Sequence, residues 1–215
     1  MRVRAVVFDL DGTLIDGYEG IHQALGFAMT RLGLPVPDRA RVREMVGHGL
    51  HRLLAQAAGP ELAADGVRLF RERYADVAIG GSRVLPGVEG TLARLAAGGC
   101  VLSVASNKPL RFTRMILEAK GIATRFAAIA GPDEAHPPKP DPAMLRSLLA
   151  AMGAAAEETV CVGDMEVDVE FARAGGCRAV VVPSGSRSLA FLRGVGADEL
   201  IESISDLPAA LARFV

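Results

Sequence analysis

The sequence is poor in aromatic residues, with eight phenylalanines, two tyrosines and no tryptophan among its 215 residues. It has no basic excess either, because 24 lysines and arginines are balanced by 25 aspartates and glutamates. Proteins that track a nucleic-acid backbone need a basic surface, and those that bind single strands add aromatic stacking groups. The composition therefore argues against a nucleic-acid partner and favours a small-molecule substrate.

Cysteine is scarce as well. Cys100, Cys161 and Cys177 form no CxxC pair and no cluster with histidine at a zinc-binding spacing. Each lies at or inside a predicted strand, where a small buried hydrophobic residue is the simpler interpretation. An odd number of unpaired thiols suits a reducing compartment, so we expect a cytoplasmic protein.

Long hydrophobic runs are also missing. No stretch approaches the roughly 20 charge-free residues of a transmembrane helix, and no apolar leader with a small-residue cleavage pattern follows Met1. We therefore expect no membrane partner and no secretory leader. Half of the residues are nevertheless hydrophobic, which is enough for one large domain or for a domain with an insert. Both a monomer and a homodimer are compatible with the sequence.

Residues 17–81 have the periodicity of helices. Apolar residues recur at three- and four-residue steps between Tyr18 and Leu32, and the pattern resumes after Asp38, which is a plausible N-cap. Two more helical segments follow before Gly80-Gly81. This block therefore predicts four short helices packed on one another.

The rest of the chain, 1–16 and 82–215, alternates between strand-like and helical segments. Such alternation predicts an α/β fold with a doubly wound parallel sheet that has helices on both faces. The helical block is then an insert after the first strand. The predicted strands are 3–8, 100–105, 126–130, 159–162, 178–182 and a short one near Leu200.

Two aspartates follow the first predicted strand directly, in the run Asp9-Leu10-Asp11-Gly12-Thr13. Residues two apart in an extended segment point the same way, so Asp9 and Asp11 lie on one side of the chain. Two like charges this close need a cation or a shared proton, and Mg²⁺ is a natural partner for carboxylates. The alternative is a solvated turn in which aspartate serves only as a turn residue.

Other polar residues follow later strands of the predicted sheet. Ser106 and Asn107 come after the second strand, Lys139 lies in the loop after the third, and Asp164 ends the fourth, with Asp168 one helical turn beyond. Because such sheets bind ligands at the carboxyl ends of their strands, this placement predicts an active site. Helix capping, a solvated loop lysine and acidic residues at a helix N-terminus are the structural alternatives.

These segments together resemble a known family. Asp9-Leu10-Asp11-Gly12-Thr13, Ser106-Asn107-Lys108, Lys139, and Gly163-Asp164 with Asp168 resemble, in order, the four motifs of the haloacid dehalogenase-like phosphohydrolases. The resemblance covers essentially the whole chain and implies a core of residues 1–16 and 82–215 with a helical cap of residues 17–81. Ser-Asn-Lys-Pro at 106–109 and Val-Gly-His-Gly-Leu at 46–50 are similar to phosphoglycolate phosphatases within the family.

The chemistry of the residues agrees with the roles that the resemblance implies. Asp9 is ionised at neutral pH and can attack phosphorus, while Mg²⁺ and Lys139 offset the charge of the phosphate oxygens. Asp11 protonates the leaving group and then activates water. The expected metal ligands are Asp9, the backbone carbonyl of Asp11, Asp164 and Asp168, the last directly, through water or by holding Lys139. The expected phosphate and substrate contacts are Gly12, Thr13, Ser106, Asn107, Lys108 and His48.

Several functions are compatible with this site. The sequence predicts a Mg²⁺-dependent phosphatase acting on a small phosphorylated metabolite, with 2-phosphoglycolate as the first candidate. Pyrophosphate, sugar phosphates and nucleoside monophosphates are the alternatives. A phosphosugar mutase is the main alternative, but related mutases have a histidine about twelve residues beyond the nucleophile, where this chain has Ile21 followed by His22. A binding protein without catalysis is a third hypothesis, and it is disfavoured because the chain keeps all of Asp9, Asp11, Lys139 and Asp164.

Overall fold

The computed structural model describes residues 2–132 and 136–214, and its centre is a parallel sheet. The strand order is β5-β4-β1-β6-β7-β8, and every neighbouring pair is parallel. The first strand therefore lies in the middle, where the order of the chain reverses. The strands are β1 (Ala5–Phe8), β4 (Val101–Ala105), β5 (Ala128–Ala130), β6 (Thr159–Gly163), β7 (Arg178–Val181) and β8 (Glu199–Leu200).

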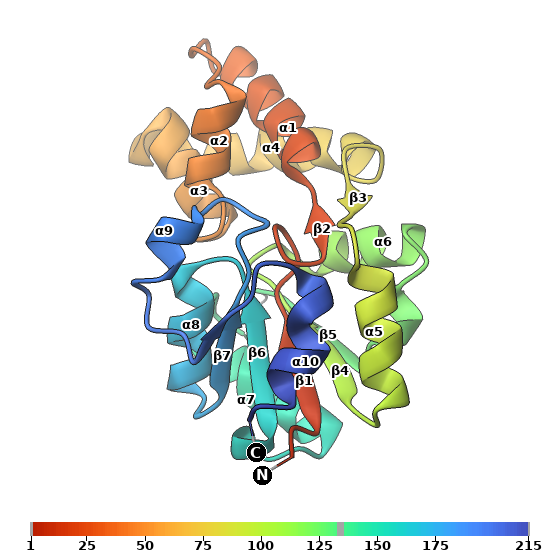
Figure 1. Cartoon of the computed structure of the whole chain (residues 1–215). Coiled ribbons are helices and arrows are strands. Elements are labelled where there is room, and N and C mark those ends of the chain that lie inside the picture. Colours follow the sequence, from red (N-terminus) through yellow and green to blue (C-terminus); the bar gives the residue numbers. More distant parts are fainter. Residues whose placement is uncertain (1, 133–135, 215) are drawn as a thin grey trace.

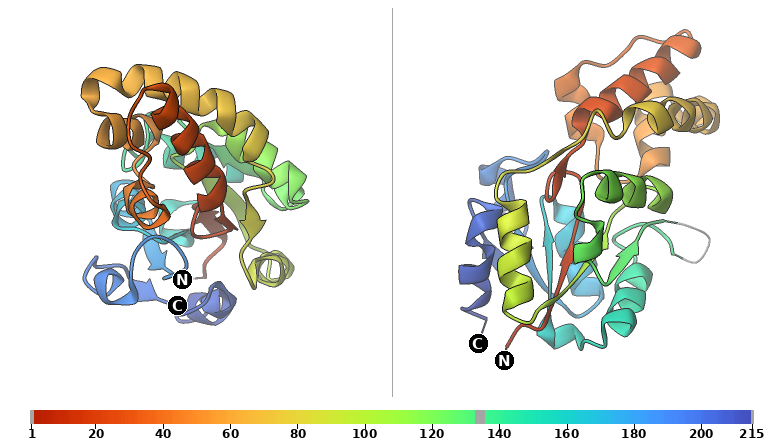
Figure 2. Two further views of the ribbon diagram at one scale, coloured as in Figure 1. Left: turned by 90° about the horizontal axis from the view of Figure 1, so that it is seen from above. Right: turned by 90° about the vertical axis from the view of Figure 1, so that its right-hand side faces the viewer.

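Helices cover both faces of this sheet (Figures 1 and 2). Side chains alternate along β1, so that Phe8 packs in one layer with Leu92 and Val7 packs in the other with Leu145. The predicted doubly wound sheet is thus confirmed. The first layer contains α5 (Val88–Ala97) and α10 (Leu207–Leu211), and the second contains α7 (Ala143–Met152) and α8 (Glu166–Ala174). The sheet is also accompanied by α6 (Leu110–Ala119) and α9 (Leu189–Leu192).

The four helices expected between the first and second strands of the sheet are present. We call them the helical unit: α1 (Tyr18–Arg31), α2 (Arg39–Met45), α3 (Leu50–Ala58) and α4 (Ala63–Val77). They lie over the carboxyl ends of the strands (Figure 1). Asp38 caps α2 as expected, because its Oδ1 accepts a hydrogen bond of 2.8 Å from the backbone N–H of Arg41. No helix in the described part of the chain is long and apolar enough to cross a membrane.

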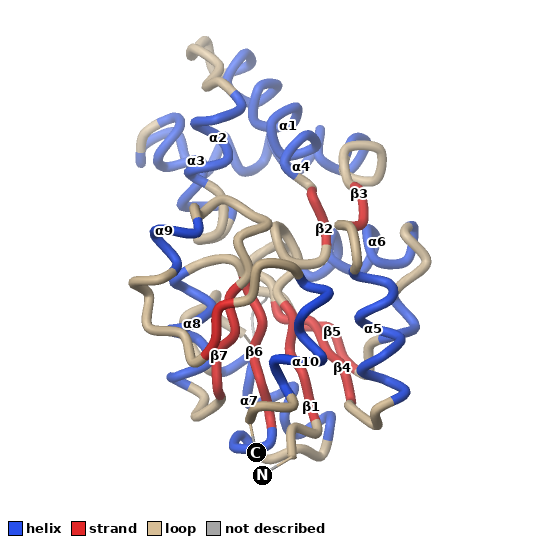
Figure 3. Tube along the Cα trace, viewed as in Figure 1, coloured by secondary structure: helices blue, strands red, loops and turns tan. Residues whose placement is uncertain are grey.

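The chain passes between the sheet and the helical unit through a small second sheet that the sequence did not predict. Its strands, β2 (Ile15–Asp16) and β3 (Arg83–Val84), are antiparallel (Figure 3). An ion pair of 2.6 Å between Arg83 and Asp16 joins them. Two-residue strands are too short to produce an alternating pattern, so periodicity cannot reveal them.

A few shorter features also differ from the expectations. The third predicted strand begins at Ala128 and not at Phe126, because a turn of 3₁₀ helix ends immediately before Phe126. α9 was not predicted, since it has only four residues; Ser188 caps it, because its Oγ accepts a hydrogen bond from the N–H of Phe191. The 3₁₀ turns are η1 (Pro60–Leu62), η2 (Ala123–Arg125), η3 (Ala156–Glu158) and η4 (Ile204–Asp206).

Packing of α5 on the sheet gives a prediction for stability. Leu92 is 1% exposed, so Leu92→Ala leaves a cavity and is expected to lower the free energy of unfolding by about 2–5 kcal/mol. Ile79 is 40% exposed, and Ile79→Ala is expected to cost about 0.5 kcal/mol or less. Urea unfolding followed by circular dichroism measures both losses. Equal losses in the two variants would show that α5 does not depend on this contact.

Candidate active site

Three carboxylates meet at the carboxyl ends of the two central strands. Asp9 follows β1, Asp164 follows β6, and Asp168 lies in the first turn of α8. Each offers an oxygen that lies within 4.8 Å of the others. Asp164 and Asp168 are buried. The three expected acidic residues are therefore brought together in one group, which we call the acidic cluster.

Glycines make this crowding possible. Gly12 has a φ of 90°, and a Cβ there would lie 2.7 Å from the Asp164 side chain. A Cβ at Gly163 would overlap Asp168, and one at Gly185 would overlap Asp164. Any side chain at these positions would displace a carboxylate, so the acidic cluster depends on them.

Lys139 enters the acidic cluster from the loop that follows β5. Its Nζ lies 2.7 Å from Asp9 Oδ1 and 2.7 Å from Asp168 Oδ1, and its side chain is buried. Burial alone would lower the pKa of Lys139, but the charges of Asp168 and Asp9 outweigh it and raise that pKa. The Lys139 ammonium is therefore fixed in its charged form beside Asp9.

Asn107 holds the backbone of Lys139. The Lys139 N–H donates to Asn107 Oδ1 over 2.7 Å, and Asn107 Nδ2 donates to the Lys139 carbonyl over 3.2 Å. The same Nδ2 also donates to the carbonyl of Gly47, in the loop that joins α2 and α3 of the helical unit, over 3.0 Å. The Asn107 side chain, expected as a phosphate ligand, thus joins three distant segments of the chain.

The acidic cluster carries more negative charge than Lys139 can balance. Burial and the charge of Asp168 together raise the pKa of Asp9 to about 7, despite the lowering effect of Lys139. Burial also raises the pKa of Asp164, with added repulsion from Asp168 and Asp9. An additional cation would relieve this repulsion and keep Asp9 ionised.

The oxygens of the acidic cluster suit a hard metal ion. Asp164 Oδ2 accepts the N–H of Ser186 over 3.0 Å, whereas its Oδ1 is buried and has no hydrogen-bond partner among the described residues. Such an orphaned carboxylate oxygen fits Mg²⁺, which binds through one or two carboxylates. Both oxygens of Asp168 are engaged, Oδ1 by Lys139 and Oδ2 by the N–H of Met165.

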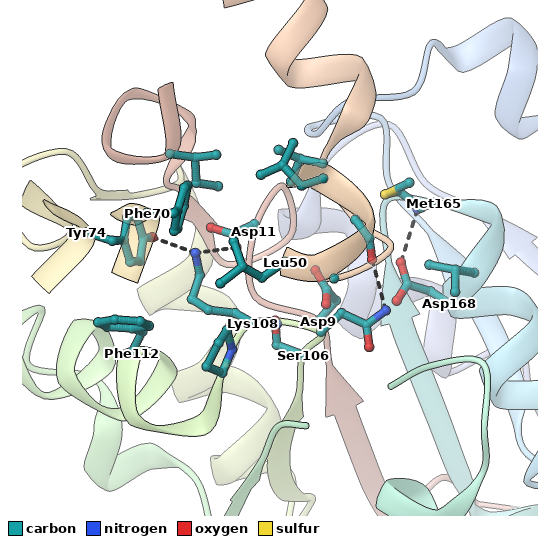
Figure 4. Close-up of a pocket in the computed structure, with 18 residues that line it drawn as sticks. Asp9, Asp11, Leu50, Phe70, Tyr74, Ser106, Lys108, Phe112, Met165 and Asp168 are labelled. Atoms are coloured by element: carbon teal, nitrogen blue, oxygen red, sulfur yellow. Dashed lines mark hydrogen bonds and ion pairs between the residues drawn. The ribbon is translucent and has the colours of Figure 1, made fainter. Parts of the chain in front are cut away.

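Asp11 lies outside the acidic cluster and pairs with Lys108. Lys108 Nζ is 2.8 Å from Asp11 Oδ2 and 2.6 Å from the hydroxyl of Tyr74 on α4. Figure 4 shows this chain of contacts on one side of the pocket, with Asp9 and Asp168 on the other. Lys108 therefore pairs with Asp11, whereas Lys139 pairs with Asp9 and Asp168.

The remaining expected contacts have varied surroundings. Ser106 lines the pocket, and its Oγ accepts the N–H of Lys108 over 3.2 Å. Thr13 is fully buried, and its Oγ1 has no partner in the described part of the chain. His48 points elsewhere, because its Nε2 is 3.7 Å from Glu166 and the residue is not part of the pocket lining.

Sequence reasoning missed residues that approach the site from a distance. Tyr74 reaches Lys108 from the helical unit, and Arg43 donates to the carbonyl of Gly185 over 2.8 Å. Glu166 pairs with Arg187 at 2.7 Å beside the same loop. Tyr74 belongs to the apolar stripe of its helix, which periodicity cannot distinguish from core packing. The one sequence feature that could have singled out Tyr74 is the scarcity of tyrosine, since the chain has only two.

Comparison with known proteins agrees with this arrangement. The family model described as haloacid dehalogenase-like hydrolase matches residues 6–182. A phosphoglycolate phosphatase of Yersinia pseudotuberculosis is 38% identical over 190 residues, which cover 85% of this chain and 82% of that protein. A phosphoglycolate phosphatase of Escherichia coli K12 is 32% identical over 233 residues, covering 97% and 92%.

Solved structures share the fold over almost the whole chain. CbbY from Rhodobacter sphaeroides, in complex with phosphate, superposes with a TM-score of 0.81 at 26% identity and covers 98% of this chain and 99% of its own. A haloacid dehalogenase-like family hydrolase from Streptococcus pneumoniae gives a TM-score of 0.90 at 24% identity, covering 97% and 98%. The chain therefore belongs to the haloacid dehalogenase-like hydrolase family and is a phosphatase of the kind that includes the phosphoglycolate phosphatases.

Proposed function

We propose that this protein is a Mg²⁺-dependent phosphomonoesterase that works through an aspartyl-phosphate on Asp9. The observation that carries the proposal is the position of Asp9, which lines the pocket and lies 2.7 Å from the Lys139 ammonium within the acidic cluster. A carboxylate attacks phosphorus readily only where positive charge offsets the phosphate oxygens. Family membership and the phosphatases among the relatives support the same reaction.

Mg²⁺ would be held by Asp9 and Asp164, with the backbone carbonyl of Asp11 as a further ligand. The unpartnered Oδ1 of Asp164 supports this assignment. Asp168, whose two oxygens are engaged, would act through water or by holding Lys139. When bound, the metal supplies positive charge to the phosphate oxygens and to Asp9.

The residues around Asp9 divide the remaining work. Lys139 stabilises the charge that develops on the transferring phosphoryl group. Asp11 serves as general acid for the leaving group and then as general base for the water that cleaves the aspartyl-phosphate. Gly12, Thr13 and Ser106 contact phosphate, as the family resemblance implies.

Asn107 is best described as a positioning residue. Its amide donates and accepts hydrogen bonds with the backbone of Lys139, so it fixes the direction from which Nζ approaches Asp9. Its bond to Gly47 ties the same loop to the helical unit. Placement of a charged group within a fraction of an ångström is what such a contact contributes to catalysis.

Residues 17–81 would form the cap over this site, and residues 1–16 and 82–215 the core. The strands β2 and β3 are the two connections between them, which supports a boundary near residues 16 and 82. A cap over the carboxyl ends of the strands excludes bulk water while the aspartyl-phosphate exists. The three cysteines are free, which supports our placement of the enzyme in the cytoplasm.

The names of the relatives make 2-phosphoglycolate the first candidate substrate. Hydrolysis is favoured over phosphosugar mutation because Ile21, and not His22, lines the pocket. A mutase needs a group in this region that recruits the acid only when sugar is bound, and Ile21 carries no such group. The pocket lining therefore supports a phosphatase.

Asp9→Asn should abolish phosphate release from 2-phosphoglycolate, with a fall in kcat on the order of 1,000-fold or more, because an amide is a poor nucleophile. Asp65→Asn, at a side chain that is 64% exposed on α4, is the matched control and should retain full activity. A colorimetric phosphate assay measures both. Turnover by the Asp9 variant at the normal rate would exclude Asp9 as the nucleophile.

Removal of Mg²⁺ with EDTA should reduce phosphate release at least about tenfold, and added Mg²⁺ should restore it. Isothermal titration calorimetry gives a readout without turnover: Mg²⁺ should bind the wild type and bind Asp164→Asn far more weakly. Asp65→Asn again serves as the control. Equal Mg²⁺ affinity in wild type and Asp164→Asn would disprove the assigned metal site.

Asn107→Asp keeps the size and one acceptor of the side chain but loses both donated bonds. We expect kcat to fall about 100-fold with little change in KM, because Lys139 is misaligned while the substrate contacts persist. Steady-state kinetics on 2-phosphoglycolate separate the two constants. A rise in KM at unchanged kcat would instead identify Asn107 as a direct substrate contact.

A further inference from the structure

The pocket extends from the acidic residues into the helical unit and has mainly apolar walls. Asp9 and Asp11 line it from the loop after β1, and Ile21, Leu50 and Leu53 contribute from α1 and α3. Figure 4 shows Leu50 between Asp9 on one side and Phe70 and Tyr74 on the other. When a phosphomonoester binds with its phosphate at Asp9, its leaving group, which is the alcohol part of the ester, would occupy this apolar part of the pocket.

Three aromatic rings line the side of the pocket that carries Lys108 and Asp11. Phe70 and Tyr74 of α4 are stacked with ring centroids 5.1 Å apart, and Phe112 of α6 meets Tyr74 edge-on at 4.9 Å. All three line the pocket. The chain has only ten phenylalanines and tyrosines, so three at one pocket are a marked concentration. Rings arranged in this way present a large apolar surface to a bound group.

The pocket offers no unbalanced positive charge to a leaving group. Among the described residues that line it, Lys108 is the sole lysine, arginine or histidine. Its ammonium is already paired with Asp11 at 2.8 Å and hydrogen-bonded with the Tyr74 hydroxyl at 2.6 Å. A charged leaving group is therefore not required for binding, and the rest of the lining beyond the polar residues near Asp9 and Lys108 is apolar.

We infer that the enzyme also hydrolyses phosphomonoesters with an uncharged, apolar leaving group that is longer than glycolate, a substrate class that rests on the phosphatase function proposed above. Asp9 and Lys139 engage the phosphate, while Leu50, Phe70 and Phe112 bury the leaving group. Each methylene group that moves from water into an apolar pocket increases the binding affinity about fourfold. The walls of the pocket thus select a longer apolar leaving group over a short one.

A series of ethyl, butyl and hexyl phosphate tests this inference, because the leaving alcohols of the series have nearly equal basicity. We expect kcat/KM to rise about sixteenfold from ethyl to butyl phosphate, because butyl has two more methylene groups. Leu50→Asn should reduce the ratio of kcat/KM for butyl phosphate to kcat/KM for ethyl phosphate, since it replaces an apolar side chain of the pocket with an amide of similar size. Ile79→Asn, at an exposed residue outside the pocket, should keep both the ratio and the activity of the wild type.

The outcomes separate this inference from the proposed function. Hydrolysis of 2-phosphoglycolate with a kcat/KM that stays flat or falls along the alkyl series overturns the apolar class and leaves the phosphatase intact. Absence of turnover on every ester with Mg²⁺ present overturns the phosphatase. Calorimetry with ethyl- and butylphosphonate, which are not hydrolysed, then tests whether the pocket prefers a longer apolar group. Tighter binding of butylphosphonate supports the apolar substrate class, and equal or weaker binding rejects it.

Discussion

The structure depends on the crowding of like charge at the carboxyl ends of two adjacent strands. Asp9 and Asp164 follow β1 and β6, whose parallel pairing forces their ends together, and Asp168 lies one turn into the helix that follows. Carboxylates so close are unfavourable without cations, which explains why Lys139 is buried among them. Burial, together with this repulsion, raises the pKa of Asp9 and of Asp164. Gly12, Gly163 and Gly185 are the steric condition for this arrangement.

Two consecutive residues after β4 connect this charge cluster to the helical unit. Asn107 bonds to Gly47 while holding Lys139, and Lys108 bonds to Tyr74 while pairing with Asp11. Asp9, through Lys139, and Asp11, through Lys108, are therefore each connected to a different part of the helical unit. Any movement of the helical unit away from the sheet would break both connections, so the alignment of both aspartates is coupled to its position.

The sequence predicts the part of the site that local patterns encode. Buried parallel strands are recognisable as apolar runs, and because their carboxyl ends converge, Asp9, Lys139, Asp164 and Asp168 could be expected together before any coordinates were known. The bonds that Asn107 makes were not predictable, since they join segments 32 and 60 residues away and have no local signature. β2 and β3 were not predicted for a related reason: they pair across a long stretch of sequence, and a strand of two residues shows no hydrophobic periodicity.

The aromatic residues of the pocket and its charged residues affect each other. Phe70, Tyr74 and Phe112 remove water from the neighbourhood of Lys108, and a pair such as Lys108 and Asp11 is stronger in the lower local dielectric that results. In the mechanism that we propose, hydrolysis nevertheless needs one water molecule, at the step that cleaves the aspartyl-phosphate. A bulky leaving group would fill the apolar space during attack by Asp9, and its departure would open that space next to Asp11. The volume that binds the leaving group would then admit the water that Asp11 activates, which would order the two half-reactions without a separate gate.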